Sequence, residues 1–194
     1  MSSNIEEPGA PRGLKESVLV AVDFLWPFAA AIVLALLLRA FVIEPFTVPT
    51  GSMLDTIQLD DTIWVEKVSY WSGGPKQGQV VTFDNPEEKG VTLVKRVIAT
   101  EGQTVDLVDG AVVVDGVALD EPYTLGKPSY PLSSQLAGID PITYPLQVPE
   151  GHVWVMGDNR TNSRDSRFFG PVPVKDVFGH AMFVLWPLSD AHWL

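Results

Sequence analysis

The chain has 194 residues and a formal net charge of −11, and 46% of its residues are hydrophobic while 19% are charged. This length and composition fit a folded domain and exclude an intrinsically disordered chain. The absence of cysteine excludes disulfides, zinc-thiolate sites and a cysteine nucleophile. Residues 44–194 contain 10 basic and 20 acidic residues, so this part would repel phosphate backbones and no nucleic-acid partner is expected.

One apolar segment dominates the N-terminal quarter, "VLVAVDFLWPFAAAIVLALLL" at 18–38, and it contains a single charge, Asp23. About 20 apolar residues span a bilayer as a helix, and this segment is apolar on every side rather than on one face. We therefore predict a transmembrane helix over 17–43, preceded by a flexible cytoplasmic tail over 1–16. A buried core helix is the alternative. A cleaved signal peptide is disfavoured because no small-x-small site closes the segment directly.

The charges that flank this segment indicate its orientation. Arg12 and Lys15 precede it, whereas only Arg39 follows closely and the next cation is Lys67. Lysine and arginine are enriched on the cytoplasmic side of membrane spans, so the N-terminus is predicted to be cytoplasmic. Residues 44–194 would then form the extracytoplasmic part of a single-pass membrane protein.

Beyond the apolar segment, short runs of β-forming residues alternate with prolines and glycines. This pattern predicts a mainly β fold, with an antiparallel β-rich sandwich or barrel over 44–194. Strands are expected at 62–68, 79–83, 92–99, 104–108, 111–119, 152–157 and 177–186. The dipeptides Asp109-Gly110 and Asp115-Gly116 are hairpin turn signals. Residues 120–148 are rich in proline and lack periodicity, so an irregular insertion is predicted there.

Ser52 lies in "FTVPTGSMLDT" at 46–56, soon after the apolar segment, and a serine hydroxyl needs a base before it can act as a nucleophile. His152 and His180 fall inside expected strands and no G-x-S-x-G elbow occurs, so Ser-His-Asp chemistry is poorly supported. Lys95 in "VTLVKRVIA" has apolar neighbours, and burial would lower the pKa of its amine. The alternative is an exposed Lys-Arg pair that protects an edge strand from aggregation.

A third segment, "GDNRTNSRDSRFFG" at 157–170, is dense in glycine, arginine and side chains that bond their own backbone, which allows a rigid loop as well as a solvated one. With "GSM" at 51–53 and "KRVIATEG" at 95–102, it resembles bacterial signal peptidase I, also called type I leader peptidase. That family comprises membrane-bound serine endopeptidases with a Ser/Lys dyad, which remove signal peptides from exported preproteins. The order of the three segments and the preceding apolar helix agree with it.

The resemblance implies a role for individual residues. Ser52 would be the nucleophile and Lys95 the general base, while Ser163 would orient the lysine amine. The oxyanion hole would consist of the Ser52 backbone N–H and the Thr50 hydroxyl. The structural positions of the family motif correspond to Arg96, Gly157, Asp158, Asn159, Arg160, Asp165 and Arg167. Pockets for small side chains would be lined by Phe46, Val48, Pro49, Met53, Ile57, Leu93 and Val94.

The resemblance also implies the setting of the reaction. No metal or cofactor is required, and the substrates would be preprotein signal peptides with Ala-x-Ala before the scissile bond. The lipid bilayer and the secretion translocon are the further partners expected. The location would be the bacterial plasma (inner) membrane, with an apolar surface of the β domain near the bilayer.

Several residues depart from the family pattern. Asp55 stands where the family has proline, Ala99 and Glu101 replace glycine and proline after the lysine box, and Asp60 replaces glycine before Asp61. A carboxylate at position 55 would oppose loss of the lysine proton.

Two other functions are alternatives to a signal peptidase. One is a Ser-Lys self-cleaving repressor, which would lack the anchor. The other is a membrane-tethered β-rich binding or scaffolding protein in which Ser52 and Lys95 are inert.

Overall fold

The computed structural model describes residues 13–71, 73–132 and 141–194. The chain divides into two compact units, Met1–Ala40 and Phe41–Leu194, which are treated separately. In the first unit the described residues form α1, which spans Leu14–Phe41 and runs one residue into the second unit. Residues 1–12 of the predicted tail lie outside the described residues, whereas Leu14–Glu16 belong to α1, so the helix begins three residues before its predicted start.

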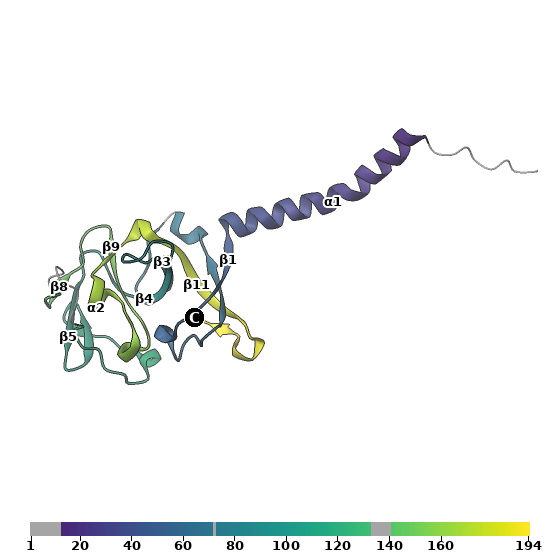
Figure 1. Cartoon of the computed structure of the whole chain (residues 1–194). Coiled ribbons are helices and arrows are strands. Elements are labelled where there is room, and N and C mark those ends of the chain that lie inside the picture. Colours follow the sequence, from purple (N-terminus) through teal and green to yellow (C-terminus); the bar gives the residue numbers. More distant parts are fainter. Residues whose placement is uncertain (1–12, 72, 133–140) are drawn as a thin grey trace, which may run out of the picture. The chain divides into compact units, whose positions relative to one another are not determined.

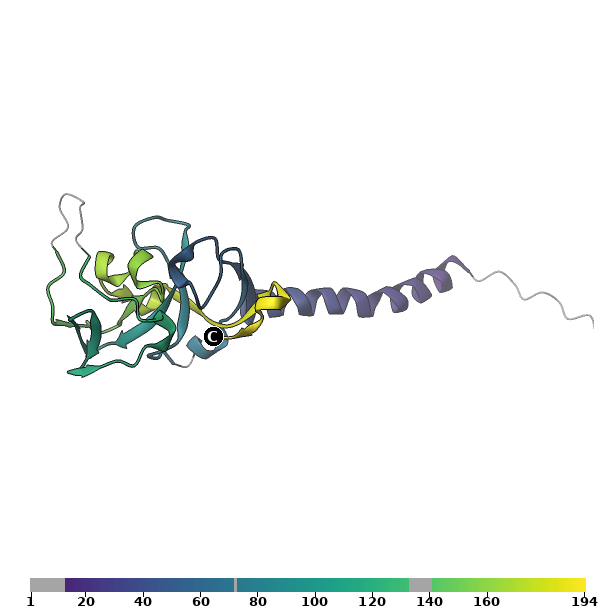
Figure 2. The same ribbon diagram turned by 90° about the horizontal axis from the view of Figure 1, so that it is seen from below.

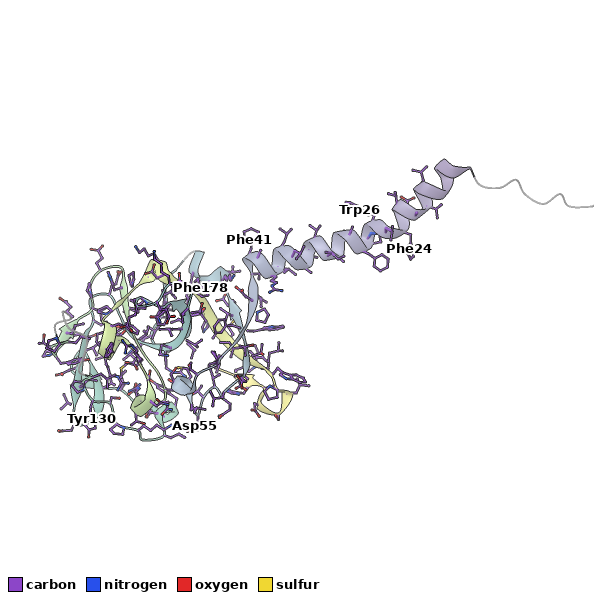
Figure 3. All side chains as sticks on the ribbon, viewed as in Figure 1. Phe24, Trp26, Phe41, Asp55, Tyr130 and Phe178 are labelled. Atoms are coloured by element: carbon purple, nitrogen blue, oxygen red, sulfur yellow. The ribbon has the colours of Figure 1, made fainter. Side chains whose placement is uncertain are left out.

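Helix α1 is long and apolar enough over Leu19–Phe41 to cross a membrane. Its apolar side chains are exposed along the whole of this stretch, and Figure 3 shows Phe24 and Trp26 projecting from the helix. Pro27 lies inside the helix, a position that membrane helices tolerate better than soluble ones. A helix that is apolar all round needs an apolar environment, which a bilayer provides.

The second unit contains a large antiparallel sheet with the order β1-β2-β11-β3-β4-β9-β10, to which β12 adds beside β11. Its strands are β1 (Ile43–Thr47), β2 (Thr62–Glu66), β3 (Val80–Asp84), β4 (Thr92–Thr100), β9 (His152–Met156), β10 (Val172–Pro173), β11 (Val177–Trp186) and β12 (His192–Trp193). Figure 1 shows β3 and β4 beside the long, curved β11. The predicted antiparallel β-rich fold is confirmed.

A smaller sheet has the order β7-β6-β5-β8, formed by β5 (Thr104–Val108), β6 (Ala111–Val114), β7 (Val117–Ala118) and β8 (Leu146–Gln147). Both predicted Asp-Gly turns close hairpins in it, and Asp109, Gly110, Asp115 and Gly116 all have positive φ. Positive φ at both central residues is the conformation that a two-residue hairpin turn requires. Figures 1 and 2 show this sheet and the C-terminal strands at opposite sides of the second unit.

Three apolar clusters fill the second unit. The first contains Val48, Met53, Ile57, Ile63, Val65, Val80, Val94, Ala181 and Val184. A second joins the smaller sheet to β4 and β9 around Trp154, and a third lies around Phe83 and Val155. Leu93 and Val97 pack in the third cluster, whereas Val94 and Ile98 pack in the other two, as the strand alternation of β4 predicts.

The remaining elements are short. They are the 3-10 helices η1 (Gly51–Met53), η2 (Val68–Trp71), η3 (Pro122–Thr124), η4 (Arg160–Asn162), η5 (Val174–Asp176) and η6 (Leu188–Asp190), and the helix α2 (Ser166–Phe169). Within the predicted insertion over 120–148, the described residues include η3 and β8, while 133–140 lie outside the described residues. The predicted helix over 17–43 ends in the structure at Phe41, since Ile43 begins β1.

Candidate active site

The nucleophile loop, residues 48–61, connects β1 to β2 and carries Ser52 in η1. Met53 and Ile57 in this loop are completely buried in the first apolar cluster, and the Ile57 N–H donates to the Met53 carbonyl at 2.9 Å. Burial of these two side chains anchors the loop to the sheet. Ser52, the residue before Met53, is 8% exposed, so its hydroxyl lies at the edge of the interior.

Lys95 projects from β4, which lies between β3 and β9 and is therefore an interior strand. This position rules out the edge-strand alternative for the Lys-Arg pair. Lys95 is only 2% exposed. Its Nζ donates to Ser52 Oγ at 2.7 Å and to the Val94 carbonyl at 2.9 Å. The serine and the lysine that the sequence analysis paired thus lie within hydrogen-bonding distance.

Burial lowers the pKa of Lys95 from its ordinary value of 10.5 to about 8, and the negative charges of Asp165 and Asp158 only partly oppose this shift. Among the described residues, no carboxylate forms a salt bridge with Lys95. A substantial fraction of neutral amine is therefore present near pH 8. A neutral amine in contact with a hydroxyl can accept its proton.

The signature loop, residues 157–170, follows β9, and its Asp158 binds the residue next to Lys95. Arg96, next to Lys95 on β4, forms a bidentate ion pair with this carboxylate, with Nε to Oδ1 at 2.9 Å and Nη2 to Oδ2 at 2.7 Å. The Thr56 hydroxyl of the nucleophile loop donates to Asp158 Oδ2 at 2.6 Å. Asp158 thereby joins the lysine strand to the nucleophile loop.

A second buried ion pair holds the signature loop internally. Arg167 donates to Asp165 through Nε and Nη2, both at 2.9 Å, and neither side chain is more than 1% exposed. Asp165 also caps α2 by accepting from the Arg167 backbone N–H, and it accepts from the Gly157 N–H at 3.0 Å. One carboxylate thus fixes both the start of the loop and its short helix.

The signature loop and the nucleophile loop are in direct contact at Ser52. The Asn159 backbone N–H donates to the Ser52 carbonyl at 3.0 Å, and Asn159 Nδ2 donates to the Gly51 carbonyl at 2.8 Å. A Cβ at position 157 would lie 2.4 Å from the Ser52 carbonyl oxygen and 2.3 Å from Ser163 Oγ. Only glycine allows this close approach of the two backbones.

Arg160 has partners that the sequence analysis did not identify. Its guanidinium forms a bidentate ion pair with Glu121 and an additional hydrogen bond with Ser129, and its side chain is almost fully buried. Tyr123, between these two partners in sequence, places its ring 4.2 Å from the Arg96 guanidinium carbon. Glu121 and Arg160 are 39 positions apart, so no local sequence pattern could have paired them.

Two other predicted site residues lie near Ser52 without direct contact to the lysine. Ser163 Oγ is buried and has no hydrogen-bond partner among the described residues, so in this structure it makes no hydrogen bond with Lys95. Thr50 precedes η1, is exposed and makes no side-chain capping bond. Its hydroxyl is free to turn toward a ligand at Ser52.

The seven residues predicted to line substrate pockets differ in accessibility. Val48, Met53, Ile57 and Val94 are buried together in the first apolar cluster, and Phe46 packs against it. Pro49 is exposed, while Leu93 packs against the third cluster. The four buried residues therefore offer almost no accessible surface in this structure, so their role in lining substrate pockets stays a prediction.

The residues that depart from the family pattern have structural explanations in part. The carboxylate of Asp55 forms an ion pair with Lys127 at 3.2 Å. Asp60 has φ of 64°, the left-handed conformation that favours glycine. Glu101 accepts from the Gly151 backbone N–H at 2.7 Å, and Ala99 is fully buried in the second cluster.

Comparisons with known proteins identify the family of the chain. The family model "Signal peptidase, peptidase S26" matches residues 21–186. The chain is 43% identical to the probable signal peptidase I-1 of Synechocystis sp., over 82% of this chain and 79% of that protein. It is 35% identical to the signal peptidase I of Leptolyngbya laminosa, over 94% of this chain and 87% of that protein. A crystal structure of a signal peptidase I from Enterococcus faecalis V583 is 30% identical, with a TM-score of 0.44 over 56% of this chain and 97% of that chain. The family match and these identities show that the chain belongs to the signal peptidase family, peptidase S26.

Proposed function

We propose that this protein is a membrane-bound serine endopeptidase that removes N-terminal signal peptides from exported preproteins, with Ser52 as nucleophile and Lys95 as general base. The observation that carries the proposal is the 2.7 Å contact between Lys95 Nζ and Ser52 Oγ at a buried position. Membership of the signal peptidase family supports the substrate class.

In the first step, neutral Lys95 accepts the Ser52 proton as the hydroxyl oxygen attacks the carbonyl carbon of the scissile peptide bond. The resulting ammonium then donates its proton to the leaving amine, which departs as the new N-terminus of the mature protein. Water hydrolyses the acyl-enzyme, with the lysine again acting as base. A second hydrogen bond, from Lys95 Nζ to the Val94 carbonyl, helps to hold the amine in place beside Ser52.

The negative charge on the carbonyl oxygen needs preorganised donors, each worth about 3–4 kcal/mol of barrier in comparable sites. The Ser52 backbone N–H and the exposed Thr50 hydroxyl are the donors that we assign. Ser163 Oγ is buried close to Gly157 and has no hydrogen-bond partner among the described residues, and we assign it as an acceptor for Lys95 during turnover. This arrangement would hold the amine during turnover.

The substrate is expected to bind as an extended peptide with small side chains before the scissile bond, of the Ala-x-Ala type. Strand β1 is at the edge of the large sheet, and its chain leads directly into the nucleophile loop. An edge strand offers unpaired backbone groups to an extended peptide. The preference for small side chains is proposed from membership of the signal peptidase family.

We also propose that the second unit lies against the outer face of the bacterial plasma membrane, with the N-terminus of α1 in the cytoplasm. The charge bias around α1 supports this orientation. A cavity of about 370 Å³ in the second unit is lined almost entirely by apolar groups of Ile43, Trp64, Glu66, Met182, Phe183 and Trp193. Exposed tryptophans are typical of membrane interfaces, so the lipid surface is the partner assigned to this patch. Preproteins that leave the secretion translocon would meet the site there.

The test is cleavage of a preprotein with an Ala-x-Ala signal peptide by the full chain in detergent. Wild type should release the mature protein, while Ser52→Ala and Lys95→Ala should reduce the rate by roughly 10³-fold or more. Lys89→Ala, which changes an exposed lysine in a turn, is the matched control and should retain the wild-type rate. Processing that survives Ser52→Ala would refute the proposed nucleophile. Tight binding without product from wild type would instead favour the non-catalytic binding protein.

A further inference from the structure

Residues 121–129, which we name the bridging segment, connect the smaller sheet to the active site. On the sheet side, the Ser129 N–H donates to the Gly110 carbonyl at 2.8 Å, in the turn between β5 and β6. On the active-site side, Glu121 and Ser129 bind the buried guanidinium of Arg160. The bridging segment is therefore anchored at both of its ends.

Lys127, near the C-terminal end of this segment, extends to the nucleophile loop. Its Nζ lies 3.2 Å from Asp55 Oδ2 and 3.5 Å from the Leu54 carbonyl oxygen. The Lys127 side chain is 28% exposed and the Asp55 side chain 54% exposed, and Figure 3 shows Asp55 at the periphery of the unit. Asp55 follows Ser52 by three positions and is the carboxylate nearest to it in sequence.

These contacts complete a ring of three segments around Ser52. The signature loop binds the nucleophile loop through Asn159, and the bridging segment binds the signature loop through Glu121 and Arg160. Lys127 closes the ring by binding the nucleophile loop at Asp55. Asn159 thus binds the nucleophile loop at Gly51 and Ser52, and Lys127 binds it at Leu54 and Asp55.

The charges around the site explain why this contact matters. Asp158 and Asp165 are the carboxylates that act on Lys95, and each is paired with a buried arginine, Arg96 or Arg167. Asp55 adds a further carboxylate to the nucleophile loop, three residues after Ser52. An unpaired carboxylate there would favour the protonated form of the nearby amine and so reduce the amount of free base.

We propose that Lys127 is a positioning residue that holds and neutralises Asp55, so that the negative charge of Asp55 does not act on the Ser52–Lys95 pair. The inference rests on the proposed function of that pair. Lys127 and Asp55 then work as a unit: the aspartate that departs from the family pattern is tolerated because the bridging segment supplies its counter-charge.

The test measures kcat/KM for preprotein cleavage as a function of pH. Lys127→Met should lower kcat/KM roughly twofold to fivefold at pH 7, the range expected for a partly exposed pair, and move the acid limb of the profile to higher pH. The loss should disappear toward pH 10, where Lys95 is neutral in either protein. Lys127→Arg retains the charge and should preserve the wild-type profile.

The double variant distinguishes charge from structure. In Asp55→Asn/Lys127→Met the carboxylate is absent, so the acid limb should return to its wild-type position. Lys67→Met removes a comparable ion pair with Glu44, whose side chains are 22% and 42% exposed, and should leave the profile unchanged. A loss in Lys127→Met that is equal at every pH, or that persists in the double variant, overturns the inference, as does an unchanged Lys127→Met profile. Absence of Ser52-dependent cleavage in wild type would instead refute the proposed function itself.

Discussion

The two loops that meet at Ser52 are held in place by different forces. The signature loop is fixed mainly by charges within or beside it, through the buried pairs Arg167–Asp165 and Arg96–Asp158. The nucleophile loop is fixed mainly by burial of Met53 and Ile57 in the apolar core. Its ion pair, Asp55–Lys127, is at the surface. The signature loop is therefore held by buried ion pairs, whereas the nucleophile loop beside it is held by apolar contacts.

The pKa of Lys95 is lowered although two buried arginines near it, Arg96 and Arg167, stay charged. Arg96 and Arg167 are buried with a carboxylate in bidentate contact, which offsets the cost of removing charge from water. Lys95 is equally buried, but its contacts are a hydroxyl and a carbonyl. The paired arginines also reduce the field of the carboxylates at Lys95. The carboxylates of the signature loop near the lysine are thus paired, and burial lowers the pKa of the amine to about 8.

The largest effect is expected from breaking the charge pair inside the signature loop. Asp165→Asn leaves the Arg167 guanidinium buried without a counter-charge, so the free energy of unfolding should fall by about 3–5 kcal/mol. Urea unfolding of the full chain in detergent measures this change. Glu87→Gln is the matched control, because it breaks the exposed pair of Arg164 in the same loop and should cost about 1 kcal/mol or less. Equal losses in the two variants would show that burial does not decide the strength of these pairs.

A stability gain is expected from removing the buried lysine. Burial lowers the pKa of Lys95 from 10.5 only to about 8, so at pH 7 the amine is protonated in both the folded and the unfolded state. The folded state therefore bears the whole free-energy cost of burying the charge. Lys95→Met should therefore raise the free energy of unfolding at pH 7, by on the order of 2–3 kcal/mol, while abolishing cleavage.

The pH dependence of that gain tests its cause. Between pH 8 and 10.5 the unfolded state of the wild type binds more protons than the folded state, so wild-type stability rises with pH and the advantage of Lys95→Met should vanish near pH 11. Unfolding midpoints at pH 7, 9 and 10.5 would follow the change. Lys89→Met, at an exposed position, should show no such dependence. A gain that is constant with pH would mean that packing, rather than charge burial, is responsible.

How much of the fold could be predicted from sequence depends on whether the signal of each element is local. Strands with alternating residues, such as β4 and β11, and the two Asp-Gly hairpins were predicted because their signals are local. The two-residue strands β8, β10 and β12 were not predicted, since two residues cannot show a periodicity. Strand β1 was also missed, because its first residue was assigned to the helix and Pro45 interrupts its pattern.

Within the site, the motif residues were identified through the family resemblance, and the pairing of Ser52 with Lys95 followed from the need for a base. The partners of Arg160 and Asp55 were missed, because Glu121 and Lys127 lie in a segment without regular pattern. Long-range ion pairs depend on how loops are brought together by the sheet. The role of Ser163 stays a prediction.

The smallest effect is expected at Asp60, where the nucleophile loop adopts a backbone conformation unfavourable to its residue. Asp60 has φ of 64°, and its N–H donates to the Val48 carbonyl at 2.9 Å, which holds the loop in this turn. Asp60→Gly removes the steric cost but gives the unfolded chain more freedom, so we expect a net gain of about 0.5 kcal/mol in the free energy of unfolding. Asp60→Ala is the control: alanine tolerates the left-handed region less well than aspartate, so it should destabilise by a similar amount. If both variants were equally destabilised, the Asp60 side chain itself would have to stabilise the loop, and the nucleophile would depend on polar contacts in the same way as the signature loop does.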